Sequence, residues 1–205
     1  EMPALTARTC GICPVSHLIA SNKACDDLLS VKIPEVAEKL RQIINLAQLI
    51  QSHALSFFHL SSPDLLLGWD ADPATRNIFG IMQHHPELAK DGIRLRQIGQ
   101  EIIEALGGKK IHPTWCVPGG VNSALSEEKR TELLGLLPEA MDIAKRTYAF
   151  YKDLLPRFRH EAAAFGHFPT LFLSLVGPKG QLEHYDGLLR IKDAQGRLVE
   201  DGIPP

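Results

Sequence analysis

Apolar residues recur at helical spacing through most of the chain. The longest such stripe follows Pro34 and continues to about Leu60. Its members recur at intervals of three or four residues, with Ile43 and Ile44 adjacent, and are Val36, Leu40, Ile43, Ile44, Ala47, Ile50 and Ala54. This periodicity is typical of an amphipathic helix that buries one face. We therefore predict a long helix from Pro34 to about Leu60, followed by a loop from Ser61 to Pro73.

Further helices are expected where a proline or a capping residue precedes an apolar repeat. Pro14 and Pro86 suit the first turn of a helix, where the missing N–H costs nothing. Ser126, followed by two glutamates, is typical of a capped helix start. The predicted helices span about residues 14–29, 74–84, 86–106 and 126–165, with Pro138 and Pro156 as kinks or breaks in the last.

The pattern changes after Pro169, where strand-like segments replace the helical repeat. Leu171–Val176 is a short apolar run bounded by glycine and proline. Leu188–Lys192 and Arg197–Glu200 flank the turn Asp193–Gly196, which predicts a β-hairpin. The expected fold is therefore mainly α.

This fold is expected to be a helical bundle over residues 1–168 with a small β-hairpin appendage over 169–205, together one domain. Residues 109–122, rich in proline and glycine, should be irregular. The chain opens at Glu1 and stops at Pro205 directly after a turn, so we expect it to be a central piece of a longer protein.

The composition indicates an ordinary globular protein without nucleic-acid or membrane functions. The 205 residues are 44% hydrophobic and 22% charged, with a formal net charge of −2. A nucleic-acid binder would normally carry a basic excess. No apolar run approaches the roughly 18 residues of a membrane span, and no secretory leader is visible. Neither nucleic acid nor membrane is expected as a partner.

Four cysteines are too few for a disulfide framework in a chain of this length. Cys25 and Cys116 stand alone and are expected to be small buried hydrophobic residues. Cys10 and Cys13 form a CxxC pair. Thiols that remain free point to a reducing compartment, so we expect a cytoplasmic protein.

The CxxC pair lies at the entrance to the helix predicted from Pro14. Cys13 should be the N-cap, and His17 falls one turn later on the same helical face. The helix dipole favours anions at this end, so both thiols are expected to have lowered pKa values and to bind metal readily. Thiolates are the ligands that nickel, iron and zinc select.

A single CxxC leaves several kinds of site open. Half a zinc site, a dithiol redox pair and a redox metal centre are equally compatible with the two thiols. A thioredoxin-like pair would need a preceding strand and a βαβ unit, which the pattern does not predict. A zinc site would need further ligands, and His53, His59 and the pair His84–His85 lack ligand-like spacing to the thiols.

The longer motif from Arg8 to His17 distinguishes between these kinds of site. It reads Arg-x-Cys-Gly-x-Cys-x-x-x-His and closely resembles the first nickel-binding motif of [NiFe] hydrogenase large subunits. Residues 52–60 resemble the His- and aromatic-rich helix of that family, and residues 108–113 with 117–120 resemble its central HP…GG loop. The bidirectional, NAD-linked cytoplasmic subgroup is most similar at residues 13–17, 61–65, 76–80 and 177–180.

The resemblance implies a role for each residue of the motif. Cys10 would be a terminal nickel ligand, and Cys13 would bridge nickel and an iron that carries diatomic ligands. His17 would donate to a ligand sulfur, although a hydrogen-bonded helix histidine is the plain alternative. Arg8 would place a positive charge beside the cluster, unless it is simply a surface arginine.

The implied reaction is the heterolytic cleavage or formation of H₂ at a Ni–Fe centre, with the proton passing to a base. Electrons would leave through the Fe–S clusters of a small subunit. They would reach NAD on flavin-containing diaphorase subunits. The family completes its metal site with a second Cys-x-x-Cys pair that this chain lacks, so the chain alone is expected to be inactive.

Three alternatives accompany this hypothesis. One is the quinone-reducing complex I subunit, which the retained thiol pair argues against because that relative holds no metal there. A second is another cytoplasmic hydrogenase subgroup, reducing a deazaflavin or NADP. The third is a zinc or redox CxxC module.

No catalytic or binding role is predicted for the other polar residues. Asp26–Asp27 and Glu127–Glu128 are expected to be solvated helix charges. His112, in the irregular segment, is not counted as catalytic.

Overall fold

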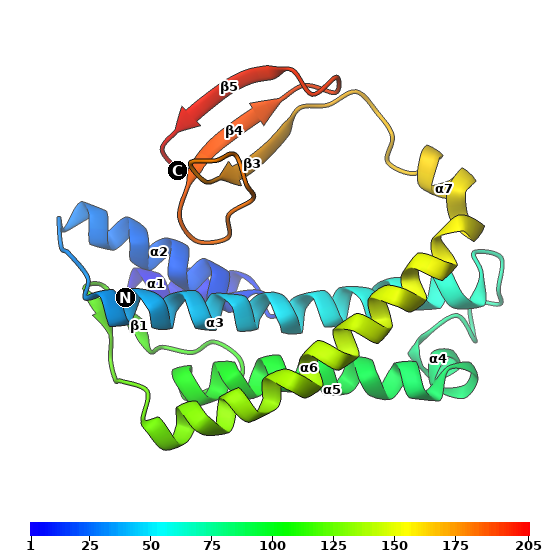
Figure 1. Ribbon diagram of the computed structural model, residues 1–205, viewed down its shortest axis with the longest axis horizontal. Helices are drawn as coiled ribbons and strands as arrows, with labels where there is room; N and C mark the ends of the chain where they lie inside the picture. Colours follow the sequence, from blue (N-terminus) through cyan, green and yellow to red (C-terminus); the bar gives the residue numbers. More distant parts are fainter. The chain divides into compact units, whose positions relative to one another are not determined.

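A computed structural model describes residues 1–205 and separates them into two units, Glu1–Tyr148 and Ala149–Pro205. Helices dominate the chain, and a small antiparallel sheet follows them near the C-terminus, which confirms the predicted mainly α fold (Figure 1). The single-domain organisation stays a prediction. None of the helices combines the length and the apolar character that a membrane span requires.

The helices of the first unit begin close to the predicted positions. Pro14 and Pro86 each occupy a first turn, and Pro34 is the N-cap of the long helix. The elements are α1 (Met2–Thr6), a 3₁₀ turn η1 (Ala7–Thr9), α2 (Pro14–Leu28), α3 (Glu35–Ala54), π-helical turns η2 (Leu55–Ser61) and η3 (Pro63–Leu67), α4 (Ile78–His84), α5 (Pro86–Gly107) and the start of α6 (Glu127–Leu154).

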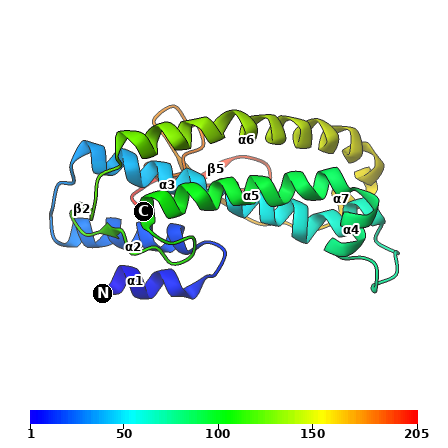
Figure 2. The same ribbon diagram turned by 90° about the horizontal axis from the view of Figure 1, so that it is seen from below.

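The two long helices α3 and α5 form the centre of this unit. They pack along each other, with α1 and α2 on one side of the pair and α6 on the other (Figures 1 and 2). Glycine allows the close approach. A Cβ atom added at Gly99 of α5 would lie 2.8 Å from the backbone nitrogen of Gln51 and 2.9 Å from the carbonyl oxygen of Ala47, both on α3. The α3 backbone is therefore held tightly against α5.

The helical coil continues past the predicted end of α3. The expected loop from Ser61 to Pro73 is wrong in its first part, because π-helical turns extend to Leu67. The hydroxyl of Ser62 donates to the carbonyl oxygen of Phe57 at 2.7 Å and so satisfies one backbone acceptor of the wider coil. Phe58 is buried there and lies directly against Gly92 of α5, which favours keeping the coil intact.

A small hairpin interrupts the irregular segment. It consists of β1 (Cys116–Val117) and β2 (Gly120–Val121) and was not expected. The fully buried guanidinium of Arg41 on α3 donates to the carbonyl oxygens of Val117 at 2.7 Å and Gly120 at 3.0 Å. It also pairs with Asp26 of α2 at 2.5 Å.

The burial of Asp26 corrects one expectation. We expected Asp26 to be solvated, but its carboxylate is enclosed between Arg41 and the backbone N–H of Gly119, which donates to it at 2.6 Å. Burial is tolerated because a charged partner and a backbone donor replace water. Asp27, Glu127 and the neighbouring Glu128 are exposed as expected.

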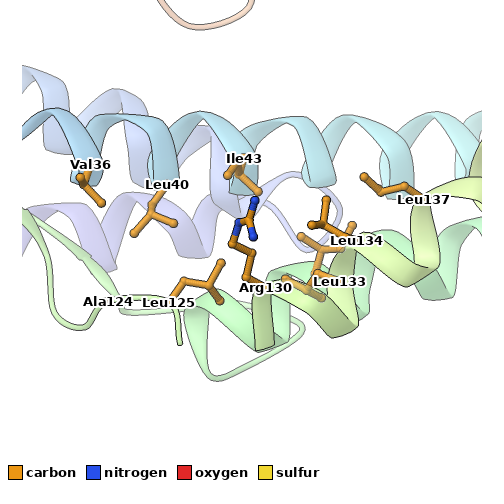
Figure 3. A pocket seen from close by; sticks show the side chains of 10 residues that line it. Val36, Leu40, Ile43, Ala124, Leu125, Arg130, Leu133, Leu134 and Leu137 are labelled. Atoms are coloured by element: carbon orange, nitrogen blue, oxygen red, sulfur yellow. The ribbon is translucent and has the colours of Figure 1, made fainter. Parts of the chain in front are cut away.

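A groove with apolar walls lies between α3, α5 and the first half of α6. Its volume is about 380 Å³. Figure 3 shows the side chain of Arg130 pointing across it toward Ile43. The walls include Val36, Leu40 and Ile43 of α3 with Leu133, Leu134 and Leu137 of α6. The groove explains why part of the apolar stripe of α3 stays exposed, since Val36 and Ile43 face it.

The second unit contains the predicted strands. The end of α6 leads into η4 (Leu155–Phe158) and α7 (Arg159–Ala164), so Pro156 does mark a break, whereas Pro138 stays inside α6. A three-stranded antiparallel sheet has the order β3 (Phe172–Val176), β4 (Leu188–Lys192) and β5 (Leu198–Ile203). The turn at residues 193–196 is confirmed, with the Asp193 N–H donating to the carbonyl oxygen of Arg197 at 3.0 Å.

Candidate metal centre

The CxxC segment forms a tight turn between η1 and α2. Cys10 ends η1 in an extended conformation, and Cys13 is the N-cap of α2 as predicted. The backbone N–H of Cys13 donates to Sγ of Cys10 at 3.0 Å. This contact replaces an ordinary side-chain cap, which is otherwise missing at this helix start. The backbone N–H of this N-cap residue, which has no partner within the helix, thus points at the sulfur atom of Cys10.

The turn and the first turn of α2 bring three potential ligands together. The two Sγ atoms of Cys10 and Cys13 and a ring nitrogen of His17 all lie within 4.8 Å of one another. Cys13 and His17 are four residues apart on one helix, which places their side chains on the same face. Both thiols are half-buried and neither forms a disulfide.

The two thiols differ in acidity. The hydrogen bond from the Cys13 thiol, and after it that from the Cys13 backbone N–H, lowers the pKa of Cys10. Burial is the largest cause that raises the pKa of Cys13 to about 11, and the hydrogen bond with Cys10 and its charge add to this. The expectation that both pKa values fall is therefore wrong for Cys13, because burial disfavours its thiolate and the adjacent Cys10 adds to this effect.

Other residues predicted near the site occupy different positions. Arg8 is exposed on η1, two residues before Cys10. His53 and His59 are exposed and do not join the thiol cluster. His112 has a positive φ of 52° and a buried Nδ1 without a hydrogen-bond partner, but it too lies outside the cluster.

Two glutamines that the sequence did not single out contact the CxxC turn. Both Gln48 and Gln51 lie on the buried face of α3. Their side-chain Nε2 atoms donate to the same acceptor, the carbonyl oxygen of Ile12, at 2.7 Å and 2.5 Å. Ile12 stands between the two cysteines. The sequence could not indicate these contacts, because a glutamine in a helix looks the same whether it is solvated or bonded to a residue far away in the chain.

The lone cysteines have structural surroundings. Cys116 is buried as expected, and burial raises the pKa of its thiol to about 11. Its carbonyl oxygen accepts from the side chain of Asn22 at 3.2 Å. Cys25 is only half-buried. Neither belongs to the cluster of Cys10, Cys13 and His17.

The donor set fits a soft first-row metal. Two sulfur atoms and one imidazole within a few ångströms are the ligands that nickel, iron and zinc prefer over magnesium or calcium. The lowered pKa of Cys10 favours the thiolate that a metal requires. A bound cation would lower the pKa of Cys13 as well, because coordination deprotonates a thiol. Three such groups could hold part of a metal centre.

Comparison with known proteins identifies the class of this site. The family described as nickel-dependent hydrogenase matches residues 1–77, which include the whole cluster. Hydrogenase relatives extend the match to nearly the full chain. The chain belongs to the nickel-dependent hydrogenase large-subunit family.

Within this family, two kinds of relative are similar to the chain. It is 46% identical to a solved "NAD+-reducing [NiFe]-hydrogenase in the H₂-reduced state", with a TM-score of 0.95, and covers 46% of that chain. It is 38% identical to the NAD-reducing hydrogenase HoxS subunit beta of Cupriavidus necator, matching 98% of this chain and 44% of the relative. It is 42% identical to a vhu subunit of the F420-non-reducing hydrogenase of Methanocaldococcus jannaschii, matching 96% and 47%.

More distant structures share the fold alone. A [NiFeSe]-hydrogenase from Dm. baculatum superposes with a TM-score of 0.76 at 20% identity. In all these comparisons the chain spans less than half the length of the relative that it matches.

Proposed function

We propose that the full-length protein containing this chain is the catalytic subunit of a [NiFe] hydrogenase that cleaves and forms H₂. The cluster of Cys10, Cys13 and His17 within 4.8 Å carries this proposal. Membership of the nickel-dependent hydrogenase family supports nickel as one of the metals. A Ni–Fe centre, its iron carrying diatomic ligands, supplies the heterolytic chemistry of H₂ when it is bound.

The protein's own residues would have separate roles. Cys10, the thiol with the lowered pKa, would be a terminal nickel ligand and could exchange a proton at Sγ. Cys13, with its Sγ beside that of Cys10, would share its sulfur between nickel and iron. His17 would orient a ligand sulfur by donating a ring N–H to it. Arg8 would contribute a positive charge near the entrance to the turn.

We further propose that electrons pass to NAD. The similarity to two NAD-reducing hydrogenases supports this acceptor. Partners would then be a small subunit with Fe–S clusters and diaphorase subunits that hold flavin and NAD. The four free thiols support a reducing, cytoplasmic location. A second candidate is a hydrogenase with another electron acceptor, which the 42% identity to the Methanocaldococcus jannaschii relative favours.

Metal content and activity of the same sample test these proposals. The full-length protein would be produced with its neighbouring subunits and maturation proteins, and nickel and iron would be measured by mass spectrometry. We expect about one nickel per catalytic subunit and a larger amount of iron, because the Fe–S clusters of the partner subunits add to the iron of the Ni–Fe centre, together with H₂-dependent reduction of NAD. Zinc in place of nickel, or no metal, would contradict the hydrogenase proposal. H₂ oxidation with an artificial dye but without NAD reduction would contradict only the acceptor.

Matched variants locate the site. Cys10→Ser and Cys13→Ser should each abolish nickel binding and H₂ oxidation, since a hydroxyl is a poor ligand for a soft metal. Cys25→Ser is the control, because Cys25 lies on the same helix as Cys13 but outside the cluster. It should keep metal and activity. Equal losses in all three variants would contradict the assignment of the site to this turn.

A further inference from the structure

The CxxC turn has little packing of its own to hold it in shape. Gly11 and Ile12, the two residues between the cysteines, are both exposed, and 41% of Ile12 is accessible to solvent. A Cβ atom added at Gly11 would meet nothing within 4 Å. Side-chain burial therefore does not fix the path of the backbone between the two sulfur atoms.

Hydrogen bonds to the carbonyl group of Ile12 fix the path of the backbone instead. The oxygen of Ile12 accepts from Nε2 of Gln48 at 2.7 Å and from Nε2 of Gln51 at 2.5 Å. The two glutamines are nearly one turn apart on α3 and belong to a different part of the chain from the turn. A carbonyl group with two donors is fixed in both position and orientation.

The glutamines are themselves held firmly. Only 1% of Gln48 and 3% of Gln51 is accessible to solvent. Gly99 of α5 packs against Gln51, and an added Cβ atom would lie 2.8 Å from its backbone nitrogen and 2.9 Å from its Cβ atom. The turn is thus tied to a point where α3 and α5 pack closely.

This arrangement is unfavourable for stability alone. The Oε1 atoms of Gln48 and Gln51 are buried without a hydrogen-bond partner. A buried unpaired acceptor costs free energy that leucine at the same position would avoid. Two such residues side by side, both directed at one carbonyl group between two metal-binding thiols, indicate a function other than stabilising the core.

We infer that Gln48 and Gln51 are positioning residues that set the geometry of the Cys10 and Cys13 sulfur atoms at the metal. The inference rests on the proposed function, because it assumes that these two thiols bind nickel. Removing the amides should leave the helices folded but let the backbone at Ile12 relax. The two sulfur atoms would then no longer be presented at a fixed separation.

Spectroscopy and metal retention of the assembled enzyme test this role. In Gln48→Leu, Gln51→Leu and the double variant, we expect altered nickel g-values in electron paramagnetic resonance. The affinity for nickel should fall about 10- to 100-fold, as is typical when residues that orient metal ligands are replaced, and a chelator should therefore remove nickel faster. The melting temperature should stay the same or rise, because the unpaired oxygens are removed. Gln97→Leu, on the exposed face of α5, is the control and should change none of these.

A conservative variant provides a rescue. In Gln51→Glu, a protonated carboxyl group can still donate to the Ile12 oxygen, whereas a carboxylate cannot. The nickel signal should therefore resemble wild type at acidic pH and change as the pH rises, while the wild-type signal does not follow this dependence. This single variant decides the question if the double leucine variant fails to assemble.

The outcomes separate this inference from the proposed function. Wild-type enzyme without nickel would contradict the proposed function. Wild-type enzyme with nickel, together with leucine variants that keep its g-values and its rate of nickel loss, would contradict the positioning role alone. A Gln51→Glu signal that is the same as wild type at every pH would contradict it too. Leucine variants that melt at lower temperature with an unchanged nickel signal would assign the glutamines a merely structural role.

Discussion

The guanidinium of Arg41 and the carboxylate of Asp26 form an ion pair at 2.5 Å that joins α3 to α2 in the interior of the protein. Arg41 is completely buried, and its remaining donors reach the carbonyl oxygens of Val117 and Gly120. Each of the three side-chain nitrogen atoms of Arg41 thus donates at least one hydrogen bond. The pair fixes the helix that carries Cys13 and His17 against the helix that carries the two glutamines.

Arg41→Met should destabilise the protein strongly. It would leave the Asp26 carboxylate buried without its cation, and breaking a buried pair from one side costs about 3–5 kcal/mol. Urea denaturation of the full-length protein measures the loss. Lys39→Met is the control, because its ion pair with Glu35 is exposed and the loss of this pair should hardly change the free energy of unfolding. Similar effects of both variants would contradict the structural role of Arg41.

Gly99→Ala should also destabilise the protein, because the new methyl group would meet the backbone of α3 at 2.8–2.9 Å. Overpacking of this kind costs about 1–3 kcal/mol. Gly135→Ala is the matched control on a helix, since an added Cβ atom there meets nothing within 4 Å. It should stabilise the protein by about 0.5–1 kcal/mol through the better helix propensity of alanine. Thermal melting tests this difference, since the melting temperature should fall in Gly99→Ala and rise in Gly135→Ala.

The two thiols should react with alkylating reagents at different pH. The thiolate is the reactive form, so a lowered pKa shifts the reaction of Cys10 to lower pH, and a raised pKa shifts that of Cys13 to higher pH. In metal-free protein, Cys10 should reach its half-maximal rate at a lower pH than an ordinary cysteine thiol does. Cys13 should do so near pH 11. Mass spectrometry after timed treatment with iodoacetamide gives both rates.

Cys10→Ser is the control for this pH dependence. It removes the charge of Cys10 and the thiol–thiol hydrogen bond, two of the causes that raise the pKa of Cys13, and leaves burial in place. The reaction of Cys13 should therefore move to lower pH. One common pH profile for both thiols in the unsubstituted protein would contradict their coupling.

Asn77→Ala should loosen the short helix α4. The side chain of Asn77 accepts from the backbone N–H groups of Phe79 at 2.9 Å and Gly80 at 3.3 Å. Loss of such an N-cap costs about 0.5–2 kcal/mol. Hydrogen exchange of the α4 amides should become faster, whereas Asn77→Asp keeps the acceptor and should retain protection. Unchanged exchange in the alanine variant would show that this cap is dispensable.

Local signals were sufficient to place most helices. Pro14, Pro34 and Pro86 mark the starts of α2, α3 and α5 because proline is favoured in the first turn of a helix or just before it and disfavoured in the interior. Gly108 ends α5 with a positive φ of 75°, a conformation that glycine adopts easily. The turn at residues 193–196 could likewise be predicted from its own four residues. Each of these features depends on a few neighbouring residues.

Contacts between distant residues could not be predicted in the same way. Gln48 and Gln51 meet Ile12 over 36 and 39 residues of sequence, and nothing in the repeat of α3 distinguishes them from solvated polar residues. The burial of Asp26 depends on Arg41 and Gly119, which the fold brings to it. The π-helical turns after Ala54 also depend on tertiary packing, through Phe58 against Gly92.

The proximity of Cys10, Cys13 and His17 was therefore predicted from the sequence, whereas the contacts that support the CxxC turn were not. The spacing of Cys10, Cys13 and His17 is local and follows from one helix start, so the sequence could indicate that they lie together. The difference in pKa between the thiols depends on their mutual hydrogen bond and burial, which spacing alone does not determine. The roles of these residues at a metal stay proposals.

The double hydrogen bond to Ile12 has a consequence for which cations the turn can select. A peptide carbonyl group offers two lone pairs, and at Ile12 both are taken by amide N–H groups. Hard cations such as calcium and magnesium depend on carbonyl and carboxylate oxygens, and this carbonyl oxygen is closed to them. The metal donors that the turn offers are therefore the sulfur atoms of Cys10 and Cys13. Magnesium and calcium, which prefer oxygen donors, would bind there only weakly.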